Sequence, residues 1–486
     1  MALSIVTQSM QQFASRHDSW AQEVFGSAQV GDSRRNDRLV CMAARAAEKP
    51  GGKISDVFAK DSERQGAYDL LESQKVKPKA LLCALGESVA RQAAKVDFVH
   101  VAVDGSSITL VDRGRTKDFG SLGALSNGSR GLKVIGALGI SPLGVPLGVF
   151  SQVWWARTQA ISQSAKAKNK RNRKRKLKEK ETRHWLEAIK DTCAVSAEAQ
   201  LWFQLDREGD NRDILLELAD TGHRFTVRAA WDRLIQTTGR DKQYLRRWMN
   251  QQAPGGSYSL EVSAAPGRSA RTAHMVVRWS RVVLRLRDRR GKNERQLEVN
   301  VVWAREEGTC PNGEKPIDWL LLTNAAVSTM AEAESVVFGY AQRWRIEDFH
   351  RTWKSGACKV EQMQLRTRQA VQVWAIILAA VAARIERLKH LARTEPEAPA
   401  SIELTRHEIQ ALIVLKRQIK KRTESIPNAL PTIGQATLWI AELGGYTGKS
   451  SGGPPGSITI RRGLDKLRPA AQVLEAIEGE RRSDQW

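Results

Sequence analysis

The pattern of apolar and polar positions predicts a group of strands in the first half of the chain. The segment FVHVAVDGSSITL, which begins at Phe98, has period-two character and carries Asp104 just before a run of small residues. We therefore expect Asp104 near the end or at the edge of a strand. Two further strands are expected at 133–140 and 145–157, joined by a hairpin turn at 141–144. These three strands would form a meander.

A second acidic position follows another apolar segment. The stretch QLWFQL ends at Asp206, and Asp210 or Asn211 would cap the helix behind it. A strand, an acid and a helix in this order place Asp206 at the carboxyl end of a sheet, where the active sites of α/β proteins lie. The alternative is an aspartate that only caps the helix or forms an ion pair.

Short strands and turns dominate the middle of the chain. From about 229 to 316 the helical pattern fades, which indicates an antiparallel β insertion. The main sheet is expected to resume at 319–327. Trp319 opens that strand, either as a core residue or as an exposed stacking platform. The fold class predicted for the chain is α/β, with helical regions on both sides.

The first 75 residues read as helical and basic. Asp32 or Ser33 would cap a helix that carries Arg34, Arg35 and Arg38 in its first turns. Arginines at a helix N-terminus oppose the helix dipole, which suggests that an external anion repays this cost. The alternative is a solvated basic face.

The stretch YAQRWRIEDFHRTWK, residues 340–354, predicts a helix with two different faces. At about 100° per residue, Tyr340, Arg343, Glu347 and Lys354 lie within about 60° of one another. The opposite side carries the apolar stripe of Ile346, Phe349 and Trp353, which would bury the helix against a core. We expect a docked helix with a polar strip facing out. The alternative is a surface strip without a function, in which Arg343 and Glu347 form an ordinary i,i+4 ion pair.

The last part of the chain is helical and short of catalytic groups. A long amphipathic helix is expected at 367–392, followed by the proline-bearing segment 392–401, which is typical of a domain boundary. Further helices are expected at 401–424 and 433–445. Together these patterns predict three domains, which are a helical domain at 1–75, an α/β domain at 76–390 with the insertion at about 229–316, and a helical domain at 391–486.

Composition narrows the class of partner. The 486 residues include 77 Lys+Arg against 53 Asp+Glu, a net charge of +24, so a polyanion is the expected partner. The longest apolar run, 371–383, is too short to span a membrane, and the N-terminus lacks the pattern of a secretory signal. We expect a protein of the cytosol or nucleoid. The most basic segment, 166–180, would be a loop that contacts phosphates, or else a solvated linker.

The cysteines and histidines do not suggest a zinc site. The five cysteines form no CxxC pair and have no metal-ligand spacing with the eight histidines. Buried free thiols are expected instead. A metal, if bound, would be held by carboxylates, which favours Mg²⁺ or Mn²⁺.

Three acids stand out in this picture: Asp104, Asp206 and Glu347. Three carboxylates at strand ends and on a docked helix can hold two divalent ions about 4 Å apart. Such a pair activates water or a 3′-hydroxyl on one side of a phosphorus and stabilises the leaving oxygen on the other. The basic balance of the chain would attract the DNA substrate.

The chain also resembles a known family. Tyr340, Arg343, Glu347 and Lys354 match the spacing of the Y-(2)-R-(3)-E-(6)-K signature of the IS-four family of bacterial insertion-sequence transposases, in the Asp-Asp-Glu superfamily. The stretches GDSRRNDRL, LDREGDN, DWLLLTNAAV and RWRIEDFHRTWKSGA are similar to the Tn-five transposase group. Similarity extends over nearly the whole chain and is weaker in the basic loop, the β insertion and the tail.

This resemblance implies a fold, a reaction and site residues. The α/β domain would be an RNase H-like core, and Asp104, Asp206 and Glu347 would be the catalytic triad that binds two Mg²⁺ ions, for which Mn²⁺ could substitute. The reaction would be cut-and-paste transposition, by nicking, hairpin formation, hairpin opening and joining of the 3′ ends to target DNA. The residues implied to contact DNA are Tyr340, Arg343 and Lys354 at phosphates, Trp319 on a flipped base, and Arg34, Arg35 and Arg38 in the domain that recognises double-stranded transposon ends.

The resemblance also implies that the helical tail mediates a homodimer in the synaptic complex. Two other functions remain open. A non-catalytic DNA-binding regulator of transposition would be expected to lack one of the acids or the N-terminal domain. A structure-selective metal-dependent nuclease would share the three acids but would need neither Trp319 nor strand transfer.

Overall fold

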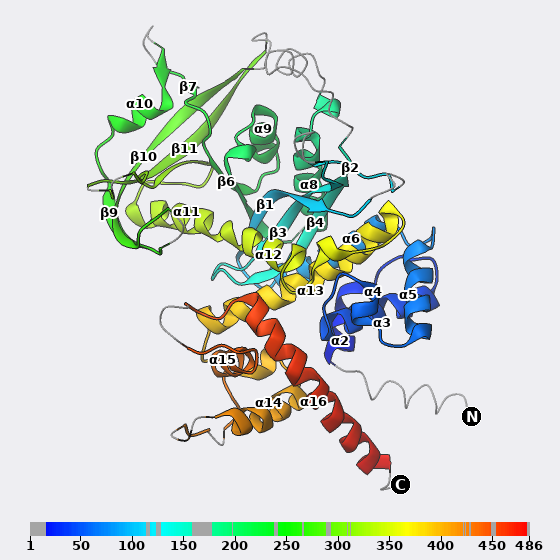
Figure 1. Ribbon diagram of the computed structural model, residues 1–486. Coiled ribbons are helices and arrows are strands. Elements are labelled where there is room, and N and C mark those ends of the chain that lie inside the picture. The colour runs from blue at the N-terminus through cyan, green and yellow to red at the C-terminus, as the bar shows by residue number, and fades with distance from the viewer. Residues whose placement is uncertain are drawn as a thin grey trace.

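The computed structural model describes residues 16–483 apart from several segments, which are 113–116, 123–127, 158–176, 197, 238–241, 265–266, 288–292, 309, 312, 421, 423, 427–428 and 449–452. Most of the predicted basic loop at 166–180 therefore lies outside the described residues. One large mixed sheet crosses the molecule, with helices on both faces and a helical region at the C-terminal end (Figure 1). The predicted α/β class is confirmed at this level.

The central part of the sheet has the strand order β4-β3-β1-β5-β6. Strands β1, β5 and β6 are parallel, whereas β3 pairs antiparallel with both β1 and β4. The predicted meander is thus present. The bounds of these strands are β1 Phe98–Thr109, β3 Arg130–Ile140, β4 Pro146–Trp155, β5 Gln200–Leu205 and β6 Arg224–Arg228, and the short β2, Gly120–Ser121, borders β3.

Side chains alternate between the two faces of this sheet. Val99, Val101 and Val103 of β1 pack in one core with the helices α8 (Thr182–Val195) and α9 (Arg212–Asp220). The intervening side chains of β1 face the helices α11 (Met330–Gln342) and α12 (Trp344–Lys354), which β1 also contacts. This alternation decides on which face an acid at the strand end will stand.

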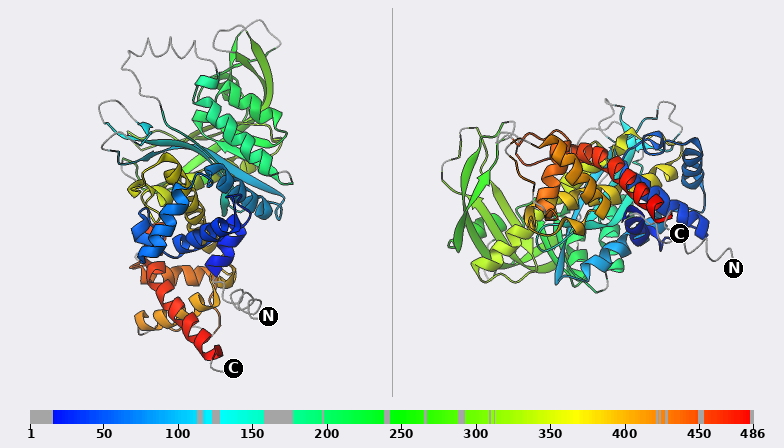
Figure 2. Two further views of the ribbon diagram at one scale, coloured as in Figure 1. Left: turned by 90° about the vertical axis from the view of Figure 1, so that its right-hand side faces the viewer. Right: turned by 90° about the horizontal axis from the view of Figure 1, so that it is seen from below.

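The inserted strands extend the same sheet. Strand β12, Asp318–Thr323, pairs with β6 on one side and with β11 on the other. The central strands and the inserted strands therefore form one continuous sheet. The long β10–β11 hairpin forms the far wing of the molecule (Figures 1 and 2). The inserted elements are β7 Leu234–Ile235, β8 Gln243–Tyr244, α10 Leu245–Asn250, β9 Gly256–Val262, β10 Arg271–Arg287 and β11 Glu294–Glu306.

The N-terminal helices share their core with a helix from much later in the chain. Helix α13, Arg368–Thr394, contacts β4, α3, α5, α6 and α12 and lies under the sheet in Figure 1. The Trp374 indole donates a hydrogen bond to the Gly52 carbonyl (3.0 Å), and Gln369 donates to the carbonyls of Ser73 and Val76. The N-terminal helices are α2 Arg16–Phe25, α3 Ser33–Glu48, α4 Ile54–Val57, α5 Asp61–Glu72 and α6 Pro78–Ala93.

The C-terminal helices form a separate apolar cluster at the other end of α13. Helices α14 (Arg406–Ile419), α15 (Ile433–Leu443) and α16 (Ser457–Ser483) pack on one another and bury Leu412, Ile440 and Leu467. Figure 2 shows this group at the end of the molecule opposite the insertion. In the part of the chain that the structure describes, no helix combines the length and apolar character needed to cross a bilayer.

Three predictions about local structure need correction. Asp104 does not end its strand, because pairing with β3 carries β1 on to Thr109, and only the pairing with β5 stops before it. The helix predicted at 340–354 is divided at Arg343 between α11 and α12. Of the five cysteines only Cys358 is buried, whereas Cys41 and Cys83 lie on exposed faces of helices.

Candidate active site

The register of two parallel strands brings the first two predicted acids together. In the β1–β5 pair, Ala102 lies beside Gln204 and Val103 beside Leu205. Carried one residue further, the same register sets Asp104 beside Asp206, on strands about 4.8 Å apart. By the alternation of side chains along each strand, both acids lie on the face of the sheet that is covered by α11 and α12, not on the face covered by α8 and α9. The sheet thus presents two carboxylates on one face.

Helix α12 carries the third acid, Glu347, which is linked to Asp104 by the Arg343 guanidinium. One guanidinium nitrogen of Arg343 lies 3.5 Å from Oδ2 of Asp104 and 3.3 Å from Oε1 of Glu347. The helix is held in place by its apolar stripe, because Ile346, Phe349 and Trp353 are fully buried, as the sequence predicted. Asp104 and Glu347 therefore meet at the Arg343 side chain, and Asp206 lies near enough for its charge to act on both Asp104 and Arg343.

Burial and crowding of like charge perturb Asp104. Its carboxyl group is almost enclosed, and burial is the main cause that raises its pKa, to about 7. The Arg343 guanidinium opposes this shift, whereas the carboxylates of Asp206 and Glu347 add to it. One Oδ of Asp104 accepts a hydrogen bond from the Gly105 amide (2.8 Å). The site therefore has more negative charge than its own cation compensates.

Arg343 is a buried cation, which corrects one prediction. The residue is only 5% exposed, so it does not belong to a strip that faces out. Burial opposes its charge, but Tyr340 and the three carboxylates outweigh burial and raise the pKa of Arg343. Among the described residues its Nε has no hydrogen-bond partner. Its guanidinium also lies over the Trp344 ring, 5.2 Å from the centroid.

Tyr340 and Trp319 support one another inside the fold. Tyr340 is 2% exposed, so the prediction of an outward-facing tyrosine is wrong, because the chain turns at Arg343 and leaves Tyr340 on α11 against the sheet. Trp319 on β12 meets the Tyr340 ring edge-on, with 5.3 Å between the centroids. Trp319 is half-buried, between the two alternatives of core residue and exposed platform.

Lys354 stands at the far end of α12. Its Nζ lies 3.9 Å from Oε1 of Glu361, and the same carboxylate oxygen accepts a hydrogen bond from the Thr109 amide at the end of β1. The structure thus places Lys354 beside the last residues of β1, several residues beyond Asp104. It does not bring the lysine into ion-pair contact with the three acids.

Asp206 keeps the capping role that the sequence left open as an alternative. Its Oδ1 accepts a hydrogen bond from the Glu208 amide (2.8 Å) and so caps the 3₁₀ turn Arg207–Gly209. Asn211 rather than Asp210 caps α9. Asp210 instead accepts hydrogen bonds from Arg233 and from the amides of the loop after β6.

Two residues near the acids were missed by the sequence reasoning. Trp344 lies beside Arg343 and is 54% exposed. Nothing in the local sequence predicts this exposure, because tryptophan in a helix is usually buried. His350 is buried, close to Gly136, which pairs with Asp104 in the sheet. Burial, together with the charges of Lys354 and Arg343, lowers the pKa of His350 to about 3, so this imidazole is neutral at physiological pH.

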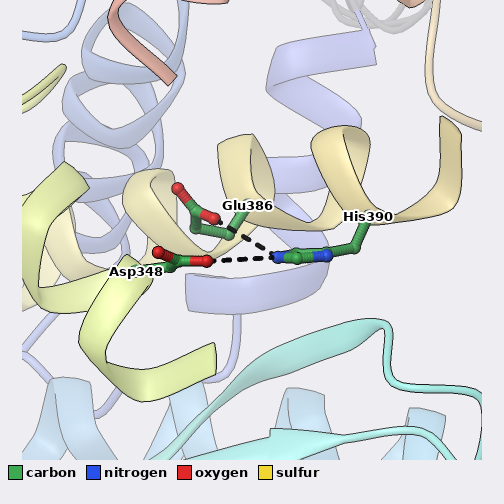
Figure 3. Close-up of side chains that lie close together, drawn as sticks. All are labelled: Asp348, Glu386 and His390. Carbon is green, nitrogen blue, oxygen red and sulfur yellow. Dashed lines mark ion pairs between the residues drawn. The ribbon is translucent and has the colours of Figure 1, made fainter. Parts of the chain in front are cut away.

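A second group of ionisable side chains lies on the other side of α12. Asp348, Glu386 and His390 converge between α12 and α13 (Figure 3), with ligand atoms within 4.8 Å of one another. The sequence did not indicate this group, because its members are separated by the loop between the two helices. Lys389 also reaches it, with its Nζ 3.4 Å from Asp348 and in contact with Glu386.

The predicted arginine cluster lies at the start of α3. Asp32 caps this helix, as predicted, by accepting a hydrogen bond from the Arg35 amide (2.9 Å). The Arg35 guanidinium folds back onto the same carboxylate (2.5 Å). Arg34 and Arg38 are exposed. The first two turns of the helix thus present two arginines to solvent.

Comparison with protein families adds to this geometry. Residues 17–76 match the model of a transposase DNA-binding domain, and residues 156–383 match that of a transposase DDE domain. Both are transposase domains. The first match contains Arg34, Arg35 and Arg38, and the second contains Asp206 and Glu347 but begins after Asp104.

The two matches agree with a DDE transposase, a nuclease-like enzyme that acts on DNA. A DDE domain implies an RNase H-like core and the use of divalent metal ions. The donor set fits such ions, because three carboxylates offer only hard oxygen ligands. The raised pKa of Asp104 points the same way, since added positive charge would relieve its crowding.

Proposed function

We propose that the chain is a cut-and-paste DNA transposase of the IS-four type, similar to the Tn-five group. The convergence of Asp104, Asp206 and Glu347 around Arg343, inside a chain that carries both transposase domains, is the observation that supports this proposal most directly. The reaction would take place on bacterial DNA in the nucleoid. The domains would be those predicted, at 1–75, 76–390 and 391–486.

Asp104, Asp206 and Glu347 would hold two Mg²⁺ or Mn²⁺ ions. Such ions activate an attacking oxygen and stabilise the leaving oxygen of an in-line displacement at phosphorus. Arg343 keeps the carboxylates assembled before DNA arrives, since its guanidinium reaches both Asp104 and Glu347. It would then donate hydrogen bonds to a phosphate, with the buried Tyr340 behind it.

The DNA chemistry would consist of four displacements at one site. Water attacks a phosphorus at the transposon end and releases a 3′-hydroxyl, which then attacks the opposite strand and closes a hairpin. A second water opens the hairpin, and the free 3′-hydroxyl attacks target DNA. Trp319 would stack on a base extruded at the hairpin, a contact worth about 1–3 kcal/mol. Lys354 would contact a phosphate further along the DNA.

The flanking regions would bind DNA ends and a second protomer. Arg34 and Arg38, exposed on α3, would contact the end repeat, and Arg35 would do so only by leaving Asp32. The C-terminal helices expose apolar side chains, which supports a homodimer. Three examples on different helices are Val414, Leu438 and Val473.

The test is single-turnover cleavage of DNA that carries the terminal repeats of the element, with Mg²⁺ or Mn²⁺, for the wild type and Glu347→Ala. We expect metal-dependent nicking followed by a hairpin product in the wild type, and retained end binding without cleavage in the variant. Binding without cleavage by the wild type would instead support a regulator of transposition. Cleavage without hairpin or strand transfer, unchanged in Trp319→Ala, would support a structure-selective nuclease.

A further inference from the structure

The strongest unexplained feature is the ion cluster behind the third acid. Asp348 follows Glu347 directly in α12, but the two carboxylates lie on different sides of the helix. Glu347 pairs with Arg343 at the candidate active site, whereas Asp348 faces α13 and pairs with Lys389. The Lys389 ammonium lies between Asp348 and Glu386, and it is only 7% exposed. A buried cation shared by two carboxylates fixes the positions of both.

A second polar link lies one turn further along α12. The Thr352 hydroxyl donates a hydrogen bond to Glu386 (2.5 Å), and the Trp353 indole donates one to the Ala375 carbonyl (2.9 Å). Asp348 and Thr352 are four residues apart, so they lie on one side of α12. Two polar links at this spacing resist rotation of α12 about its own axis, which apolar packing alone resists less.

The cluster does not have the properties of a free metal site. Asp348, Glu386 and His390 could offer ligand atoms (Figure 3), but the Lys389 ammonium already supplies the positive charge there. The Nε2 of His390 lies 3.8 Å from Asp348 and 3.6 Å from Glu386, beyond hydrogen-bond distance. A divalent ion would have to displace the ammonium, at the cost of burying it without a partner.

We propose that Lys389 is a positioning residue for the third acid: by holding Asp348 and Glu386 together, it locks the rotation of α12 and so keeps Glu347 in place beside Asp104. This inference rests on the proposed function for its catalytic consequence, but not for its structural one. Loss of the lysine would leave the buried Glu386 carboxylate facing the partly exposed Asp348 carboxylate without a cation between them. Their repulsion would turn α12 and move Glu347 away from Arg343.

The test compares Lys389→Met with Lys389→Arg, which keeps the charge, and with Arg351→Ala. Arg351 also pairs with Asp348 (3.0 Å), but its side chain is 68% exposed. It is therefore the matched control, because its substitution removes a cation from the same carboxylate without removing a buried ion pair. Amide hydrogen exchange is measured on each protein without DNA. We expect at least tenfold faster exchange across 344–354 in Lys389→Met, partial recovery in Lys389→Arg and no change in Arg351→Ala.

Two further measurements separate positioning from general destabilisation. In Mn²⁺ titrations without DNA, followed by electron paramagnetic resonance, we expect Lys389→Met to bind several-fold more weakly. In single-turnover cleavage we expect its rate to fall at least tenfold with end binding unchanged. If Lys389→Met does not fold, Asp348→Asn replaces it in all three measurements. This variant keeps the side-chain shape but loses the ion pair between α12 and Lys389, so we expect changes in the same direction, but smaller because no carboxylate repulsion arises.

The outcomes are distinguishable from failure of the proposed function. A wild type that does not cleave contradicts the proposed function, while hydrogen exchange still decides the role of Lys389. A folded Lys389→Met protein with wild-type exchange and wild-type Mn²⁺ affinity overturns the inference. So does a Mn²⁺ site that survives in Glu347→Ala and is lost in His390→Ala, because the cluster would then hold a metal.

Discussion

Asp104 shows at the scale of a single residue how the site opposes the stability of the fold. Its pKa is raised to about 7 in the folded protein, chiefly by burial, whereas an unfolded aspartate titrates near 3.8. Between these values the folded state holds a proton that the unfolded state has released. The free energy of unfolding therefore falls as the pH rises through this window, and the loss is complete above about pH 7.

Replacing Asp104 should stabilise the protein without metal. At about 1.4 kcal/mol per pKa unit, we expect Asp104→Asn to raise the free energy of unfolding by roughly 2–4 kcal/mol at pH 8 and by little at pH 4. Urea denaturation at both pH values, in buffer with a chelator, measures this. Asp97→Asn, an exposed acid just before the same strand, is the control. A stability gain that does not depend on pH would contradict the assignment.

The sequence predicted the acids better than it predicted their surroundings. Asp104 and Asp206 stand out because each follows a run of apolar residues, although in the folded chain only Asp206 follows its strand and Asp104 lies within β1. The burial of Tyr340 and Arg343 could not be predicted, because it depends on a turn at Arg343, inside a stretch whose residues all favour a continuous helix. Exposure of Trp344 depends on the same turn.

At the scale of elements, glycines set how closely two C-terminal helices approach. A Cβ on Gly463 of α16 would lie 1.7 Å from the Ile440 carbonyl oxygen, and one on Gly444 would lie 2.0 Å from that of Thr459. Neither contact can be relieved by moving a flexible side chain, because both oxygens belong to the backbone. Helices α15 and α16 are therefore in direct backbone contact.

Gly463→Ala should separate these two helices. In an exposed helix this substitution gains about 1 kcal/mol, but here we expect a net loss of roughly 1–3 kcal/mol, because the added methyl group overpacks the crossing. The urea midpoint measures the change. Gly456→Ala is the matched control, since a Cβ there has open space around it, and we expect a loss of less than about 1 kcal/mol from the poorer helix cap. Equal effects of the two substitutions would show that the crossing is not tight.

At this scale the positions of strands and helices along the chain were largely predictable, but which strands pair with one another was not. Apolar segments bounded by turn residues or an acid located β1, β3, β4 and β5 to within a few residues, because these central strands are buried on both faces of the sheet over most of their length. That β12 would pair with both β6 and β11, and so join the insertion to the main sheet, depends on contacts between residues far apart in the sequence. No local pattern carries that information.

At the scale of the molecule, the N-terminal helices are not independent of the rest. Their apolar residues form one cluster with those of α13, including Leu39, Phe58 and Trp374. Arg468 of α16 adds a hydrogen bond to the Glu48 carbonyl (2.8 Å). The DNA-binding match at 17–76 thus covers helices whose core is completed by residues about three hundred positions later.

A fragment of residues 1–76 should therefore not fold cooperatively. Without α13, Leu39, Phe58 and their neighbours would remain exposed, and small isolated helices are marginal in water. We expect reduced helical circular dichroism and a broad thermal transition, compared with a sharp transition for the whole chain. Addition of DNA carrying the end repeats could restore helix by mass action. A sharp transition of the free fragment would show that α13 is dispensable.

The dependence of the first helices on α13 has a consequence for how the protein is made. A ribosome releases the chain from its N-terminus, and domains usually fold in that order. Here the apolar side of the first helices has no partner until α13 emerges, after about four-fifths of the chain has been synthesised. The growing polypeptide must keep that surface from aggregating for most of its synthesis, so its yield in cells should depend on chaperones more strongly than its final stability suggests.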